Sequence, residues 1–267
     1  MPIIEQKIIG KRSQETCEDG IVTTADFIAV IDGSTSKSPI QLSPRMRNGR
    51  YCMLLISDFI KKMKAEITCS EFCEQVTALI QHVYTEKKAD IERLQTHPTE
   101  RLTASAIIYS RCQNKIWMIG DCQCMTDSVW HTNTKPQEEE IASKRSAYIT
   151  KALMEGKQTA DFQTVDEGRN AILPELISSC SQQNLTFAVI DGFKIPLEKV
   201  KILKAGTENV LASDGYPILK NTLQESENLL HQQLHDDPLC IHQFKATKGL
   251  MKGNVSFDDR AYIRFTV

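Results

Sequence analysis

Acidic residues follow three separate apolar runs of the sequence, each at the point where the run ends. Asp32 follows FIAVI, Asp121 follows IWMIG and Asp214 follows NVLAS. Short β-branched runs predict strands, so the three carboxylates are expected at a sheet rim, where side chains from separate strands can converge. Carboxylate oxygens suit hard cations such as Mg²⁺ and Mn²⁺. The pattern favours an oxygen-ligand metal site, although an Asp-Gly pair after a strand is also a common turn signal.

Two pairs of adjacent acids are further candidates for this site. Glu18 and Asp19 precede the run at 27–32, and Asp258 opens the last apolar run together with Asp259. Two neighbouring acids are an unusual way to begin a buried strand unless a positive partner is present. We therefore expect both pairs to lie near the same ligand.

Composition and charge narrow the classes of protein. The chain has 267 residues, is 41% hydrophobic and carries a net charge of −2 from 32 basic and 34 acidic residues that are interspersed. This balance predicts neither a nucleic-acid nor a membrane partner, and the length suits one domain covering residues 1–267. No apolar stretch reaches ~18 residues and the start lacks a signal-peptide pattern, which predicts a cytoplasmic protein.

The nine cysteines could indicate disulfides or zinc, but their number is odd and no CxxC pair occurs. Reduced thiols are the better interpretation. The closest set is Cys112, Cys122 and Cys124, for which core packing is favoured over a metal role.

The expected elements suggest two sheets flanked by helices rather than an alternating parallel fold. Apolar residues recur at helical spacing over 45–64 and 70–95, and a helical region at 137–181, broken near Gly156 and Pro174, could form a mobile flap over a site. The runs at 102–110, 115–120 and 122–130 suit an antiparallel meander. Other strands are expected at 3–9, 27–32, 185–190, 200–204, 209–213 and 255–267, with a helix at 216–235.

Six motifs in order resemble the metal-dependent serine/threonine protein phosphatases of type 2C. They are CEDG (17–20), FIAVIDGS (27–34), TASAIIY (103–109), MIGDCQ (118–123), VLASDGY (210–216) and DDRAYIRF (258–265). The resemblance covers nearly the whole chain and implies an α+β fold, the four-layer α/β/β/α sandwich of two mainly antiparallel sheets. It also implies hydrolysis of phosphoserine or phosphothreonine in proteins with two Mg²⁺ or Mn²⁺ ions and a third, weaker ion.

The resemblance implies a role for each matching residue. Asp32 would bridge two metals and Gly33 would offer its backbone carbonyl. Asp214 and Asp258 would complete the shell of one metal. Glu18 and Asp19 would support the other metal of the pair through direct or water-mediated contacts, and Asp121 would serve the weaker third ion.

Family members place an arginine shortly before the first acidic motif to hold the substrate phosphate. Lys11 and Arg12 are the basic residues there, and Arg12 is favoured because its planar guanidinium can engage two phosphate oxygens. A solvated surface charge is the alternative for Arg12.

The chain also departs from the family pattern. It has DGSTSK after the first metal aspartate, CED for NED, GDCQ for GDSR, and Arg260 with Ala261 in the last motif. These departures mark a divergent member and leave its substrate open. A phosphatase-like regulator that binds phosphoproteins without turnover and a phosphatase of small metabolites therefore remain alternatives.

Two sets of residues imitate a metal site. Asp191 repeats the AVIDG context of Asp32 but is assigned to a turn. His231 and His235 stand at i, i+4 spacing, for which an exposed helix face is favoured over metal binding.

Overall fold

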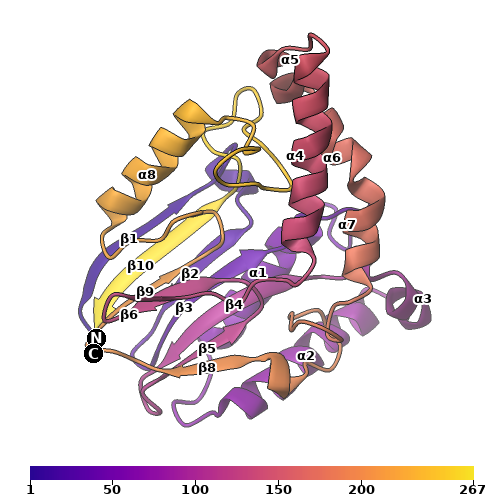
Figure 1. Cartoon of the computed structure of the whole chain (residues 1–267). Coiled ribbons are helices and arrows are strands. Elements are labelled where there is room, and N and C mark those ends of the chain that lie inside the picture. Colours follow the sequence, from indigo (N-terminus) through magenta and orange to yellow (C-terminus); the bar gives the residue numbers. More distant parts are fainter.

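Two five-stranded antiparallel sheets stack face to face in the computed structural model, which describes residues 1–267 (Figure 1). One sheet has the order β1-β10-β9-β6-β7 and the other β2-β3-β4-β5-β8. The strands are β1 (Ile3–Ile9), β2 (Asp19–Thr23), β3 (Phe27–Gly33), β4 (Ala104–Ser110), β5 (Lys115–Ile119), β6 (Gln123–Thr126), β7 (Val129–His131), β8 (Lys201–Lys204), β9 (Glu208–Ala212) and β10 (Arg260–Thr266).

Strand β3 shows why its sequence is apolar without alternation. Ile28 and Val30 pack into the core between the two sheets. Phe27, Ala29 and Ile31 point to the opposite face, into the core beneath two helices. A strand that is covered on both faces has no solvent side, so every position except the last few is apolar.

Helices cover the outer face of each sheet and complete the four layers. On the β3 side lie α1 (Asn48–Ile60) and α2 (Cys69–Glu86), with the short α3 (Ile91–Thr96) following. On the β9 side, α8 (Leu223–Asp236) packs Leu230 and Leu234 against the sheet. The two stacked sheets with helices on each outer face confirm the predicted α/β/β/α sandwich.

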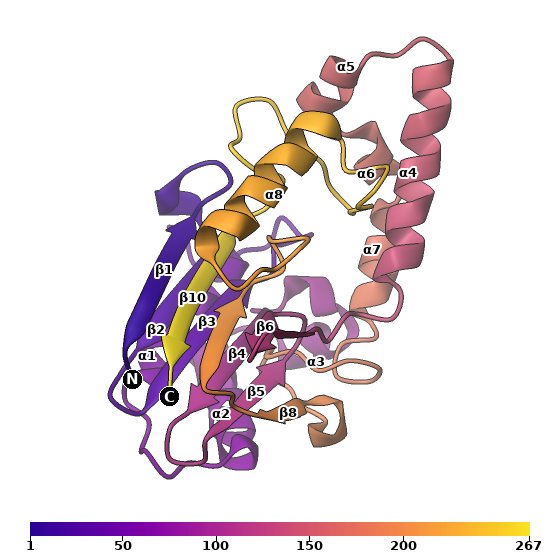
Figure 2. The ribbon, with the colours of Figure 1, turned by 60° about the vertical axis from the view of Figure 1, so that its left-hand side comes forward.

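The helical region predicted at 137–181 forms four helices that stand beside the sandwich (Figure 2). They are α4 (Glu138–Met154), α5 (Thr159–Thr164), α6 (Glu167–Ala171) and α7 (Leu173–Cys180). Gly156, at φ +101°, follows the end of α4, whereas Pro174 begins a helix. The fully buried Arg145 ties α4 to Asp166 before α6 and to the backbone carbonyls of Leu239 and Ala246. The mobility of this region stays a prediction.

Three expectations about strands were wrong. The run at 122–130 does not continue a meander, because Asp127 and Ser128 adopt positive φ and form a two-residue turn between β6 and β7, both in the other sheet. The run at 185–190 is no strand and makes only isolated bridges, from Ile190 to Ala104 and from Phe187 to Gln183. Strand β2 was missed because it begins with Asp-Gly, which is typical of turns.

Helix bounds were predicted too widely, since the stretch at 70–95 divides into α2 and α3 and the last helix begins at Leu223. None of the helices has the length and apolar content required to span a bilayer.

Candidate metal centre

Three aspartates from three strand ends converge where the two sheets meet. Asp32 lies in β3, Asp121 follows β5, and Asp214 follows β9 of the other sheet. Each offers a carboxylate oxygen, and these oxygens all lie within 4.8 Å of one another. The three aspartates that follow apolar runs converge as the sequence predicts, whereas Asp258, which was expected beside Asp32 and Asp214, lies outside this group of three.

Local backbone geometry allows this approach. Gly120 precedes Asp121 with φ +92°, and a Cβ added there would lie 2.2 Å from the Oγ atom of Ser105. The absence of a side chain lets Ser105 donate a hydrogen bond of 2.5 Å to Oδ1 of Asp121. In the sheet, Asp32 lies directly opposite Ser105 on one side and Asp19 on the other. The register therefore brings Asp19 to the same group.

Burial and mutual repulsion make the ionised state of Asp19, Asp32 and Asp214 unfavourable. Burial, followed by the charges of Asp121 and Asp258, raises the pKa of Asp214 to about 7. Burial also raises the pKa of Asp32 and of Asp19 well above their usual range, and neighbouring carboxylates add to the shift. A divalent cation would reverse this effect because it favours the ionised form.

Two buried carboxylate oxygens have no hydrogen-bond partner in the protein, and a cation bound there would pair with them. Glu18 and Asp19 are each only 4% exposed, and Oε1 of Glu18 and Oδ2 of Asp19 are unpaired. Unpaired buried carboxylate oxygens are costly, and oxygen-only donor sets suit Mg²⁺ and Mn²⁺. The residues present therefore fit the predicted metal centre.

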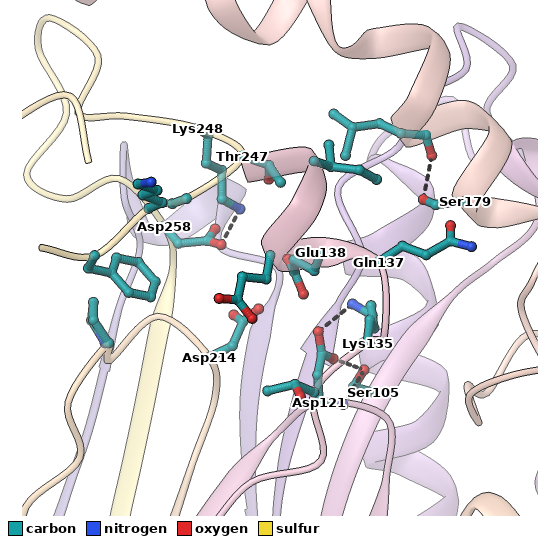
Figure 3. A pocket seen from close by; sticks show the side chains of 18 of the residues that line it. Ser105, Asp121, Lys135, Gln137, Glu138, Ser179, Asp214, Thr247, Lys248 and Asp258 are labelled. Carbon is teal, nitrogen blue, oxygen red and sulfur yellow. Dashed lines mark hydrogen bonds and ion pairs between the residues drawn. The ribbon is translucent and has the colours of Figure 1, made fainter. Parts of the chain in front are cut away.

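Lysines form ion pairs with three of the predicted ligands, Glu18, Asp121 and Asp258, and Figure 3 shows those at Asp121 and Asp258. Lys135 forms an ion pair with Asp121, and Lys248 forms one with Asp258. Nζ of Lys11 lies 3.1 Å from Oδ1 of Asp258. Although burial opposes it, Lys248 and Lys11 hold the pKa of Asp258 below its usual range, and Lys135 does the same for Asp121.

Asp259 holds the first acidic motif in place. Its carboxylate accepts hydrogen bonds from the backbone N–H groups of Lys11, at 2.7 Å, and Glu18, at 3.2 Å. It also lies 3.2 Å from Nζ of Lys11. The second acid of the last motif therefore positions Glu18 through the backbone, and Lys11 is the positive partner that the adjacent acids require.

Arg12 and Gly33 differ in how far the structure supports their predicted roles. Arg12 is exposed and forms no ion pair or hydrogen bond, whereas Nζ of Lys11 contacts the acids, and neither residue lines the cavity. The phosphate-binding role expected of Arg12 stays a prediction. Gly33 lines the cavity and packs closely on Gly49 at the start of α1, where a Cβ would lie 2.3 Å from the Gly49 carbonyl oxygen. Its role as a carbonyl ligand stays a prediction.

The residues that imitate a metal site lie elsewhere. Asp191 is fully buried, forms an ion pair of 2.7 Å with Arg101 and accepts from the backbone N–H of Phe193, as expected for a turn. The exposed ring of His231 lies 3.8 Å from a carboxylate of Glu227. All nine cysteines are free thiols, and Cys112 alone is exposed.

A cavity of about 800 Å³ opens above the aspartates. Its floor is the rim of the sheets with Asp32, Asp121, Asp214 and Asp258. Its walls come from the segment after β3, the start of α4, the helices α6 and α7, and the loop at 242–248. The helices beside the sandwich therefore enclose the acids, in the place expected of a flap.

Sequence reasoning missed Ser105, Lys135 and Lys248. Ser105 could have been found, because it lies two residues after Thr103 in the strand that pairs with β3. Lys135 and Lys248 lie in irregular segments without periodicity, so nothing in the sequence distinguishes them from surface lysines.

Comparison with known proteins gives similarity of fold only. No family model and no curated protein matches the chain. Among solved structures, the chain is similar to PppA, described as a key regulatory component of T6SS in Pseudomonas aeruginosa, with 11% identity over 98% of this chain and 96% of that one and a TM-score of 0.48. It is also similar to the catalytic domain of the phosphatase PstP in complex with two manganese ions, with 13% identity over 99% of both chains and a TM-score of 0.45.

The serine/threonine phosphatase Stp1 from Staphylococcus aureus gives 13% identity over all of this chain and 96% of that one, with a TM-score of 0.45. These structures include phosphatases of the class that the six motifs resemble. Because the TM-scores are below 0.5, the fold assignment rests on the sheet topology and the site rests on its own geometry.

Proposed function

We propose that the chain is a metal-dependent phosphomonoester hydrolase that acts on phosphoserine or phosphothreonine in proteins. The convergence of Asp32, Asp121 and Asp214 beside unpaired buried carboxylate oxygens is the observation that carries the proposal. Seven residues would hold two Mg²⁺ or Mn²⁺ ions: Glu18, Asp19, Asp32, Gly33, Asp121, Asp214 and Asp258. Asp121 would also serve a weaker third ion. The predicted cytoplasmic location of the chain belongs to the same proposal.

The chemistry needs no nucleophile from the protein. Divalent ions would supply a polarised water and positive charge for the phosphoryl oxygens. The carboxylates would hold the ions at the cavity floor. Without the positive charge of the ions, the carboxylates would repel a phosphate dianion. Lys135 and Lys248 stand at the edge of this floor, where their ammonium groups can attract the ester.

One observation favours a second candidate, a phosphoprotein-binding regulator without turnover. Lys135 and Lys248 already contact Asp121 and Asp258, and a lysine that stays on a ligand carboxylate weakens metal binding there. Such a protein would still bind a phosphoprotein but would not hydrolyse it.

An activity assay with a metal chelator separates the two candidates. The purified protein should hydrolyse p-nitrophenyl phosphate or a phosphothreonine peptide with Mn²⁺ or Mg²⁺ and lose this activity in EDTA. Calorimetry would count the ions in parallel. Metal binding without turnover on a broad phosphopeptide panel would support the regulator and refute the enzyme.

A further inference from the structure

Two cations on the cavity wall have no acidic partner. Lys37 lies in the segment after β3, and Arg169 lies in α6. The ammonium of Lys37 forms no ion pair or hydrogen bond. The Arg169 guanidinium donates only through Nη1, to the carbonyl oxygen of Thr247 at 2.7 Å and its hydroxyl at 3.4 Å. The remaining guanidinium N–H groups are free.

The charged groups near Lys37 are mainly positive, whereas Asp258, Asp166 and Glu138 as well as Arg145 lie near Arg169. Burial, together with the nearby charges of Lys135, Arg169 and Lys248, lowers the pKa of Lys37. Burial likewise lowers the pKa of Arg169. Lys135 and Lys248 differ in that each already has a carboxylate partner on the floor. Acids therefore predominate on the floor, whereas Lys37 and Arg169 on the wall form no ion pair, although Glu138 and Glu139 also line the cavity.

Arg169 is held in position before any ligand arrives. Its backbone N–H donates 2.8 Å to Oδ1 of Asp166, and Asp166 is paired with the fully buried Arg145. A cation that is fixed in this way loses little conformational freedom when it binds an anion.

We propose that Lys37 and Arg169 form a second anion-binding subsite, which receives a negatively charged group of the substrate other than the phosphate that is hydrolysed. The inference rests on the proposed function for the floor of the cavity. The substrate class is a phosphopeptide with an aspartate, glutamate or second phosphate close to the scissile phosphoresidue. A cavity of about 800 Å³ is larger than a phosphate group requires, so flanking residues of a peptide can enter it.

The test compares two phosphothreonine peptides that differ only in flanking aspartates or alanines. The wild-type protein with Mn²⁺ should show a kcat/KM about tenfold higher for the acidic peptide, because a charged hydrogen bond to a half-buried group contributes on this scale. The ratio should fall towards one in Lys37→Gln and in Arg169→Gln. Lys37→Arg, which keeps the charge, should retain the preference.

Lys245→Gln is the matched control, since Lys245 lines the same cavity but is exposed. It should keep the preference, and melting temperatures should show that the variants are folded. A ratio near one in the wild type, or the same ratio in Lys37→Gln and Lys245→Gln, would overturn the subsite.

A binding assay keeps this inference separate from the proposed function. Fluorescence anisotropy with the same two peptides, carrying a phosphonate that cannot be hydrolysed, measures the preference without turnover. Tighter binding of the acidic phosphonate that is lost in Lys37→Gln supports the subsite even if the protein hydrolyses neither peptide. Equal binding of both phosphonates by a protein that is active refutes the subsite alone.

Discussion

Replacing Asp214 by asparagine should stabilise the metal-free protein. The pKa of Asp214 is raised from 3.8 to about 7, because the carboxylate is buried beside Asp121 and Asp258. A raised folded-state pKa means that stability falls as pH rises through this window, by about 4 kcal/mol in total if nothing relaxes. Asparagine keeps the shape and removes the charge. We expect Asp214→Asn to gain about 2 to 4 kcal/mol at pH 8, roughly 5 to 10 °C in melting temperature, and nothing below pH 4.

Thermal unfolding in EDTA measures the stability that Asp214→Asn gains, and thermal unfolding in Mn²⁺ measures how metal changes that gain. Saturating Mn²⁺ should stabilise the wild type by about 3 kcal/mol at a hundredfold excess over Kd, and Asp214→Asn by less, because a ligand is lost. The stability advantage of Asp214→Asn over the wild type should therefore shrink when metal is added.

Asp166→Asn is the matched control, because this buried carboxylate is paired with Arg145. The same chemical change should cost about 3 kcal/mol with or without metal, since it leaves a buried charge uncompensated. If Asp214→Asn lowers the melting temperature in EDTA at pH 8 as much as Asp166→Asn does, the reasoning from repulsion is refuted.

Three further predictions concern other parts of the molecule. Asp32→Asn should lower kcat on a phosphothreonine peptide by orders of magnitude at any substrate concentration, and near-normal kcat would exclude a metal role. Lys11→Met should lower the melting temperature in EDTA, because the carboxylates that Lys11 contacts lose their positive partner. Arg12→Ala should keep both the melting temperature and KM near wild type. Equal effects of the two substitutions would show that Arg12 also contacts the acids or the substrate. Arg260→Met should cost about 3 kcal/mol in urea unfolding, because Glu227 loses its bidentate partner; an unchanged midpoint would contradict this.

The strand ends could be predicted because an apolar run and the acidic residue that follows it coincide there. In β3, continuous burial requires an apolar run, and Asp32 ends it at the rim. The same holds for β9 and Asp214. Since the strands converge at one end of the two sheets, identifying the strands was enough to place their acids together.

The positive partners could not be predicted, because their positions depend on tertiary packing. Lys248 reaches Asp258 from a loop that is held by Arg145 through the carbonyl of Ala246. Lys135 reaches Asp121 from the segment before α4. Neither segment has a repeating pattern of its own. The preference for Arg12 over Lys11 weighed the chemistry of the head group without knowing which side chain faces the acids, and in the structure that side chain is Lys11.

The formal charge of the site favours more than one divalent ion. The group at the sheet rim contains Glu18, Asp19, Asp32, Asp121, Asp214, Asp258 and Asp259, and its ion-paired lysines are Lys11, Lys135 and Lys248. Seven acids against three lysines leave a charge of −4 if all are ionised, which two divalent ions would balance. In the absence of metal the structure lowers this charge differently, by raising the pKa of Asp19, Asp32 and Asp214. Metal binding below about pH 7 must therefore displace protons, so metal affinity should rise with pH over the window in which the apo protein loses stability.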